Sequence, residues 1–167
     1  VGLTRTAPTF WEVAARAGLR TVAANWWASW PASDRDGVVL TERAALRIER
    51  GGRLDHEIAP ESIYEALRPR WPALAAGADA LVGRRFGTAR DPALEPVRVA
   101  ASVDAVQVAL TRAVVTGRED LIAVYLPGLD IASEALFGRA SSPETTLGPA
   151  MAPGELSRRL QALRPLY

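Results

Sequence analysis

The sequence has no cysteine and no lysine, and it contains a single histidine, His56. The lack of cysteine excludes disulfide bonds, thiolate nucleophiles and cysteine-based zinc sites. One histidine cannot build a multi-histidine metal site on its own. No apolar run approaches the roughly 20 residues that cross a bilayer, so we expect no membrane span. The formal net charge is only +1 and the arginines are scattered, so we expect no nucleic-acid scaffold as a partner.

The composition that remains fits a folded domain. Hydrophobic residues make up 49% and charged residues 23% of the 167 positions, which is close to the average of globular proteins. A chain of this length is long enough to bury a core. We therefore expect an ordered domain rather than a disordered chain.

The first segment, residues 1–58, opens with helix punctuation. Thr9 and Glu12 have the spacing of a capping box, in which each side chain bonds the amide of the other residue. Gly18 suits the left-handed position that ends a helix. We predict a helix over about 9–17.

Two short apolar runs follow in the same segment. Residues 20–26 are rich in strand-forming side chains and are predicted to be a strand buried on both faces. A turn is predicted at 33–37. Residues 38–40 are predicted to form the second strand.

The second segment, residues 59–97, is rich in proline, glycine and arginine. A helix is predicted to start at Pro60 and to run to about Leu67. Beyond it a partial helix is expected over 73–82, but much of 68–96 is predicted to be loop, so the segment as a whole is expected to be a loop-rich insertion or cap. This prediction rests on four prolines that are expected to interrupt helices: Pro69, Pro72, Pro92 and Pro96.

The third segment, residues 98–140, returns to regular patterns. Apolar residues at three- and four-residue steps predict a helix over 98–116, and the apolar run 121–125 predicts a central strand of a parallel sheet. The tail, residues 141–167, is expected to be loop followed by a short final helix over 155–164. Strand, long helix and strand in this order predict the α/β class, with a mostly parallel sheet flanked by helices.

Two carboxylates mark the place where chemistry is expected. Ligands of open α/β sheets bind beyond the carboxyl ends of the strands, and Asp130 follows the run 121–125 at the start of a predicted helix over 131–137. Glu134 lies one helical turn later on the same face, and two such carboxylates suit a hard divalent cation and also zinc. The alternative needs no metal, because Asp130 can cap the helix while Glu134 faces water. Spacing alone leaves both interpretations open.

Trp26, Trp27 and Trp30 form a cluster after the first predicted strand. Such aromatic side chains either shape a stacking surface for a ligand or pack in the core, with each indole N–H bonded to a carbonyl. Core packing is the commoner outcome. His56 lies in a polar stretch and is predicted to be a surface residue rather than a general base.

Two parts of the sequence carry a family resemblance. The first comprises Thr9–Gly18, the tryptophan-rich Thr21–Pro31 and Gly37–Arg43, and the second is Asp120–Asp130, an apolar run that ends in an aspartate. In this order and spacing they resemble type I phosphodiesterase/nucleotide pyrophosphatase-like proteins of the alkaline phosphatase superfamily. The resemblance implies a partial alkaline-phosphatase-like layered fold, of which this chain is an interior fragment.

The resemblance also implies a function, the hydrolysis of phosphoester substrates by a metal-dependent enzyme. Enzymes of this family use two metal ions, usually zinc, and a threonine or serine nucleophile. Asp130 would then be a metal ligand, and Glu134 stands where the family has a histidine. The family's nucleophile and remaining ligands have no counterpart in this sequence.

Three interpretations of the function follow. The chain is a segment of a metal-dependent phosphodiesterase/phosphatase-like hydrolase that is inactive by itself, or a non-catalytic pseudo-enzyme or interaction module that keeps the fold, or an unrelated α/β domain. If the central strands pair with segments outside this sequence, their edges are exposed here. We then expect either a homo-oligomer or a smaller, rearranged sheet.

Overall fold

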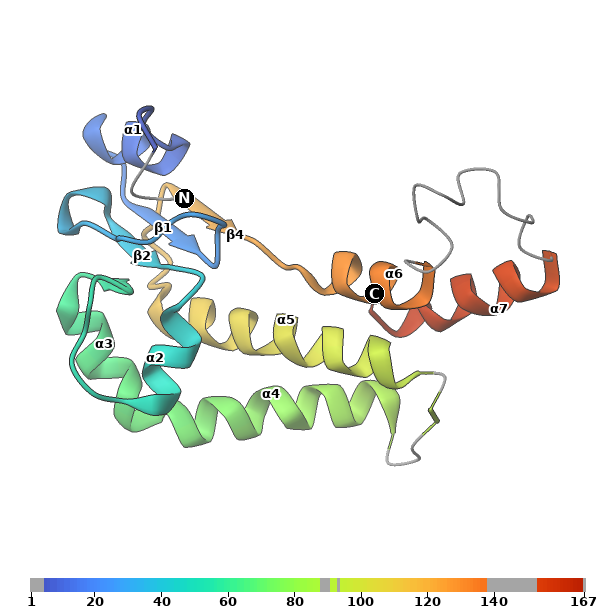
Figure 1. Cartoon of the computed structure of the whole chain (residues 1–167). Coiled ribbons are helices and arrows are strands. Elements are labelled where there is room, and N and C mark those ends of the chain that lie inside the picture. Colours follow the sequence, from blue (N-terminus) through green and yellow to red (C-terminus); the bar gives the residue numbers. More distant parts are fainter. Residues whose placement is uncertain (1–4, 88–90, 93, 138–152, 167) are drawn as a thin grey trace. The chain divides into compact units, whose positions relative to one another are not determined.

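The structure is a computed structural model and describes residues 5–87, 91–92, 94–137 and 153–166. Helices and short strands alternate along the chain (Figure 1). In order they are α1 (Phe10–Arg16), β1 (Thr21–Ala24), the 3-10 turn η2 (Asp34–Asp36), β2 (Val38–Leu40), α2 (Ala44–Arg50), β3 (Ile58–Ala59), α3 (Glu61–Leu67), η3 (Arg68–Arg70), α4 (Trp71–Phe86), α5 (Glu95–Val114), β4 (Leu121–Val124), α6 (Gly128–Phe137), α7 (Pro153–Ala162) and η6 (Arg164–Leu166).

The four strands form one mixed sheet in the order β3-β2-β1-β4. β1 pairs in parallel with both β2 and β4, whereas β3 pairs antiparallel with β2. Helices flank the sheet (Figure 1). The predicted α/β class is therefore confirmed, with the antiparallel β3 making the sheet mixed.

β1 is buried on both faces, as its apolar sequence predicts. Each of its residues is at most 3% exposed. Because side chains alternate across a strand, Val22 and Ala24 pack in one cluster while Ala23 packs in another. The first cluster is the main core, and its other large members come from β2, α2, β3, α3 and α5: Leu40, Ile48, Ile58, Tyr64, Leu67, Leu110 and Val114.

The predicted capping box is present at the start of α1. Glu12 Oε2 accepts the N–H of Thr9 at 2.5 Å, and Thr9 Oγ1 accepts the N–H of Glu12 at 3.3 Å. Arg5 adds an ion pair to Glu12 at 2.6 Å. The local sequence thus determines where this helix begins, because two of its free amide groups find partners within the same turn.

The helix predicted over 60–67 is confirmed as α3, but the prediction of a loop-rich stretch beyond it is wrong for residues 71–86. These residues form α4, a helix of 16 residues. Pro72 and Pro96 are the second residues of α4 and α5. A proline in the first turn of a helix costs no hydrogen bond, since the amide it lacks would have had no partner there. Both prolines therefore mark helix starts.

The strand predicted at 121–125 is confirmed as β4, but its position differs from the prediction. It lies at the edge of the sheet, beside β1, and not at the centre. Its side chains are correspondingly only partly covered, and Ile122 is 46% exposed. A continuous apolar run is compatible with an edge strand as well as with a central one, so the sequence pattern did not distinguish the two.

Two further elements had no sequence signal that predicted them. α2 lacks a side-chain cap at its start, and β3 has two residues. The final helix is present as α7, two residues earlier than predicted. The loop expected before it lies outside the described residues.

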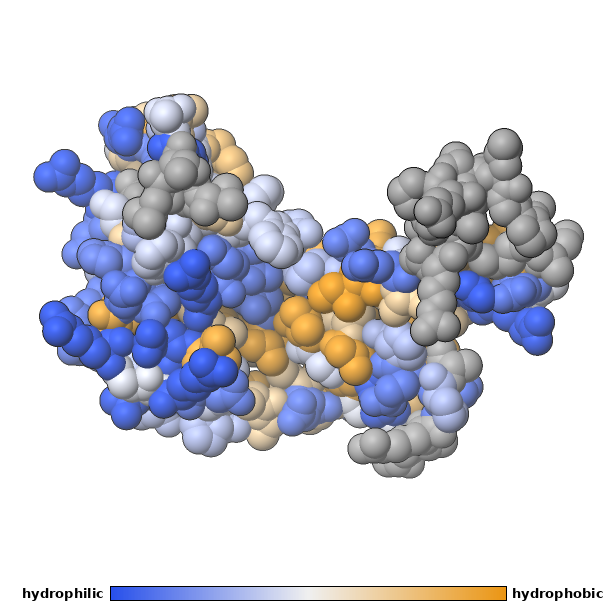
Figure 2. All heavy atoms as spheres, viewed as in Figure 1, coloured by the Kyte–Doolittle hydropathy of each residue, from blue (hydrophilic) through white to orange (hydrophobic). Residues whose placement is uncertain are grey.

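The chain divides into two compact units, one of residues 1–77 with 106–125 and the other of residues 78–105 with 126–167. The sheet and the main core belong to the first. The second has its own cluster, formed by Val97, Ala100 and Ala132 with partly buried residues of α4, α6 and α7 around it. Figure 2 shows a mainly hydrophilic surface over α2 and α3 and hydrophobic side chains along the visible side of α5. None of the helices within the described ranges has the length and apolar character of a membrane span.

Candidate functional site

Asp130 and Glu134, the predicted metal ligands, lie on one helix of the second unit. α6 begins at Gly128, so Asp130 is its third residue and Glu134 lies one turn further on. Residues four apart share a helix face, and both side chains are exposed. The two carboxylates therefore belong to one water-facing surface of α6.

The start of α6 is capped by Asp104 of α5, a residue that the sequence did not single out. Asp104 Oδ1 accepts the N–H of Gly128 at 2.8 Å. The Asp104 carboxylate lies so close to Gly128 that a Cβ added at Gly128 would lie 2.2 Å from Asp104 Oδ2. Asp130 lies inside the first turn, where its charge interacts favourably with the positive end of the helix dipole. The N-cap interpretation of Asp130 is thus wrong, and Asp104 has that role.

The capping carboxylate gives a prediction about stability and pH. Burial raises the pKa of Asp104 above its ordinary value of 3.8, although the Gly128 N–H opposes the shift. The folded protein then favours the protonated form, so this contribution to stability is present below about pH 3.8 and is lost as the pH rises through the raised pKa. Asparagine keeps the oxygen acceptor and removes the charge. We expect Asp104→Asn to raise the free energy of unfolding at pH 7 by up to about 1 kcal/mol.

Urea unfolding of both proteins at pH 3 and pH 7 measures this difference. The extra free energy of unfolding of Asp104→Asn relative to the wild type should be smaller at pH 3, where the aspartate is protonated. A wild type that is the more stable protein at pH 7 would show that the charge interaction with the helix end outweighs the cost of burial.

Asp130 and Glu134 have no third ligand beside them in the part of the chain that the structure describes. No group of three or more histidine, cysteine, aspartate or glutamate side chains with metal-binding geometry occurs there. The predicted metal site therefore consists, within these residues, of two oxygen-donating side chains.

The first unit contains the carboxyl edge of the sheet, where parallel strands end side by side and where α/β sheets bind ligands. Asn25 follows β1 with a positive φ of 61°. Its N–H donates to Leu40 O at 2.7 Å, and its Nδ2 donates to Tyr125 O at 2.9 Å. One asparagine thereby joins the ends of β1, β2 and β4.

The tryptophan loop, residues 26–31, leaves this edge and is held by Glu42. Glu42 Oε2 accepts the N–H of Trp30 at 3.2 Å and lies 2.9 Å from Ser29 Oγ. The same hydroxyl lies 2.6 Å from Trp26 O. The Arg43 guanidinium stacks 4.0 Å from the centre of the Trp30 ring, a cation–π contact. The loop is thus fixed to the residues that follow β2.

The three tryptophans of this loop have different environments. Trp30 is partly buried, and its Nε1 donates to Asp55 O at 2.7 Å. Trp26 packs against the rings of Phe10 and Trp11, and its buried Nε1 has no partner in the described structure. Core packing is confirmed for Trp26, although its indole N–H lacks the predicted carbonyl partner among the described residues, whereas Trp30 has that partner but stacks on the exposed Arg43 side chain. For Trp27 the core-packing prediction is wrong, because this residue is 71% exposed.

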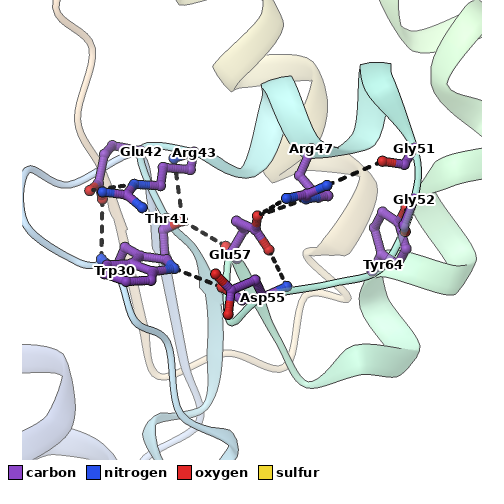
Figure 3. Close-up of polar contacts among 10 residues, drawn as sticks. All are labelled: Trp30, Thr41, Glu42, Arg43, Arg47, Gly51, Gly52, Asp55, Glu57 and Tyr64. Atoms are coloured by element: carbon purple, nitrogen blue, oxygen red, sulfur yellow. Dashed lines mark hydrogen bonds and ion pairs between the residues drawn. The ribbon is translucent and has the colours of Figure 1, made fainter.

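A partly buried ion pair between Arg47 and Glu57 is connected to Trp30 through Asp55 (Figure 3). Glu57 is 5% exposed, and its Oε1 accepts from Arg47 Nε at 2.7 Å while its Oε2 accepts the N–H of Asp55 at 2.5 Å. Its carbonyl accepts from Thr41 Oγ1 at 2.7 Å. Burial acts to raise the pKa of Glu57, but Arg47 and the amide donors outweigh it and hold the pKa below the ordinary 4.5.

His56 is exposed, as predicted, and adopts a positive φ of 56°. It lines a pocket of about 410 Å³, together with Ala32, Ser33, Asp34, Arg35, Leu54, Ile58, Ala59 and Glu61. The charged lining residues are exposed side chains of both signs. This mixed lining does not favour one class of ligand.

Four polar residues fix the geometry of these sites through their hydrogen bonds, and none of them was predicted from the sequence: Asn25, Glu42, Glu57 and Asp104. An asparagine directly after an apolar strand is a usable signal for a left-handed residue. Each of the three carboxylates has a partner 10 or more positions away, and no local pattern indicates such pairs. In comparisons with known proteins, no family model, no curated protein and no solved structure matches this chain.

Proposed function

We propose that this chain is part of a metal-dependent phosphoester hydrolase of the alkaline-phosphatase kind, in which Asp130 and Glu134 bind one divalent metal ion. One observation carries the proposal. β4 runs parallel to β1, and the helix that follows it carries both carboxylates on one exposed face, Asp130 in the first turn and Glu134 in the next. The resemblance of the segment Asp120–Asp130 to that family is the second support for the proposal.

The donor set fits a divalent cation in part. Two carboxylates supply the oxygen ligands that magnesium, manganese and calcium prefer, and zinc accepts them too. When bound, such an ion polarises a phosphoryl oxygen. Asp130 and Glu134 would hold it from one side only, so we expect further ligands to come from outside the described residues. We expect no phosphoester turnover by the chain alone.

The alternative function is a non-catalytic member that keeps the fold. Glu134 favours it, because an added negative charge in place of the family's histidine lowers the net positive charge available to a phosphoryl transition state. Metal binding without any turnover fits the first proposal, whereas the absence of metal binding fits this alternative.

Manganese titration followed by the loss of the free-ion electron paramagnetic resonance signal tests the metal site. We expect one weak site per chain, with a dissociation constant of about 0.1–1 mM. Binding should fall at least tenfold in Asp130→Asn/Glu134→Gln, since both ligands are then uncharged.

The chain supplies its own matched control. Glu61 and Glu65 are two exposed carboxylates four residues apart on α3, one of them in the first turn. The variant Glu61→Gln/Glu65→Gln should bind manganese as the wild type does. An equal loss in both variants would mean that any pair of helical carboxylates gives the signal, and the proposed site would be abandoned.

Turnover is tested with bis(4-nitrophenyl) phosphate in the presence of zinc or manganese. We expect no release of 4-nitrophenol above the rate of the metal alone. Release that disappears in Asp130→Asn would contradict the view that the chain is inactive by itself.

A further inference from the structure

We propose that Trp27, with Tyr125 beside it, is a stacking site for the planar aromatic ring of a small ligand such as a nucleoside. The site lies in the first unit and needs neither a metal ion nor Asp130. The proposal is therefore independent of the proposed function and goes beyond it.

The exposure of Trp27 is the first observation. The side chain is 71% exposed, so most of its indole surface is in contact with water. Its neighbour in the sequence, Trp26, is instead packed among other aromatic rings. The centre of the Tyr125 ring lies 6.4 Å from that of Trp27, with the planes inclined at 68°. Two steeply inclined rings form a corner in which a flat ring can lie on one and touch the other.

The rigidity of the loop is the second observation. Trp26 and Trp27 lie between two residues with positive φ, Asn25 at 61° and Ala28 at 58°. Asparagine tolerates this conformation, but alanine adopts it rarely and at a cost. Hydrogen bonds from Asn25 and Ser29 fix the backbone on both sides. Strained residues of this kind concentrate at ligand-binding and catalytic sites. Here they fix the backbone on both sides of the pair that contains Trp27, whose indole is exposed to water.

The location is the third observation. Asn25 brings the ends of β1, β2 and β4 together, and the tryptophan loop starts at this carboxyl edge. Side chains at such an edge meet the ligands of α/β sheets. A ligand ring that covers the indole would bury apolar surface without any movement of the loop, because the loop is already fixed. A preorganised aromatic surface loses little conformational entropy on binding.

Adenosine is the probe that tests the site, because it carries a planar ring and no phosphate. The indole N–H signals of the full chain are followed by nuclear magnetic resonance during titration in the presence of EDTA. We expect the Trp27 signal to shift in a saturable way, and Trp27→Ala to weaken adenosine binding about tenfold. Trp27→Phe should retain part of the affinity, since a smaller ring still stacks.

Phe10→Ala is the matched control, because Phe10 is also a partly exposed aromatic residue of the first unit but contacts Trp11 and Trp26. This variant should bind adenosine as the wild type does. Methyl β-glucoside, a ring with no π-system, should leave the Trp27 signal in place. The proposal is overturned by a larger response to the glucoside than to adenosine, by adenosine shifts that survive Trp27→Ala, or by no shift at millimolar adenosine.

Discussion

Replacement of Glu57 by alanine is expected to lower the free energy of unfolding by about 3 kcal/mol. The carboxylate is 5% exposed and accepts from the Arg47 guanidinium and from the Asp55 amide (Figure 3). Alanine leaves the Asp55 N–H without its acceptor and the guanidinium without its counter-charge. The Arg47 side chain is 29% exposed and can still reach water, which keeps the loss near the lower end of the range for a broken buried pair.

The pH dependence of this pair has a definite sign. The pKa of Glu57 is lower in the folded protein than its ordinary value of 4.5. The folded state therefore binds the proton less tightly than the unfolded chain does. The pair stabilises the fold fully above about pH 4.5, and this stabilisation is lost as the pH falls through the lowered pKa. Acidification should thus reduce the difference in the free energy of unfolding between the wild type and Glu57→Ala. Asp104→Asn behaves in the opposite way, because its free energy of unfolding should exceed that of the wild type at neutral pH.

Urea unfolding at pH 7 and at pH 3 measures both effects through the transition midpoint. Glu57→Gln should lose less than Glu57→Ala, because one amide oxygen remains as an acceptor. Glu49→Ala removes an exposed glutamate from the helix that carries Arg47, and it should change stability by less than about 0.5 kcal/mol. Equal losses in Glu57→Ala and Glu49→Ala would show that the buried pair contributes nothing specific.

Local signals predicted the elements that local interactions determine. The capping box of α1 needs only Thr9 and Glu12, three residues apart, and the structure has it where the sequence places it. β1 was predictable because four consecutive residues are buried on both faces, which demands an apolar run. In each case the residues that set the structure lie within one turn or one strand.

Elements that depend on distant partners were not predictable in the same way. Pro72 and Pro96 look the same in the sequence whether they end a helix or begin one, and the residues that pack against α4 and α5 decide between the two. β3 is only two residues long, and its pairing with β2 defines it. The edge position of β4 depends on which strands pair with it, and its own apolar sequence does not contain that information.

In the candidate site, too, features set by neighbouring residues were predictable, and features set by distant residues were not. The helical spacing of Asp130 and Glu134 was predictable, because it follows from the period of a helix. The capping of that helix by Asp104 was not, since 24 residues separate Asp104 from Gly128. For the tryptophans, composition indicated an aromatic cluster, but the exposure of Trp27 follows from the left-handed residues on either side of the pair.

Replacement of Gly37 by alanine is expected to lower the free energy of unfolding by about 3 kcal/mol or more. Gly37 joins η2 to β2 with φ of 80° and ψ of −148°, a region that is essentially restricted to glycine. A Cβ at this position would lie 2.1 Å from Thr21 Oγ1 and 2.7 Å from Thr21 O. Thr21 belongs to the buried strand β1, so its backbone cannot move aside without disturbing the sheet.

Gly77→Ala is the matched control, because the same methyl group meets open space inside α4. Alanine is the better helix former, so this variant should gain about 0.5–1 kcal/mol. Adding Thr21→Ala to Gly37→Ala removes the shortest contact but leaves the Thr21 carbonyl and the unfavourable φ, so only part of the stability should return. A fully restored double variant would assign the cost to the threonine hydroxyl alone, and a neutral Gly37→Ala would mean that the turn before β2 adopts another conformation in solution.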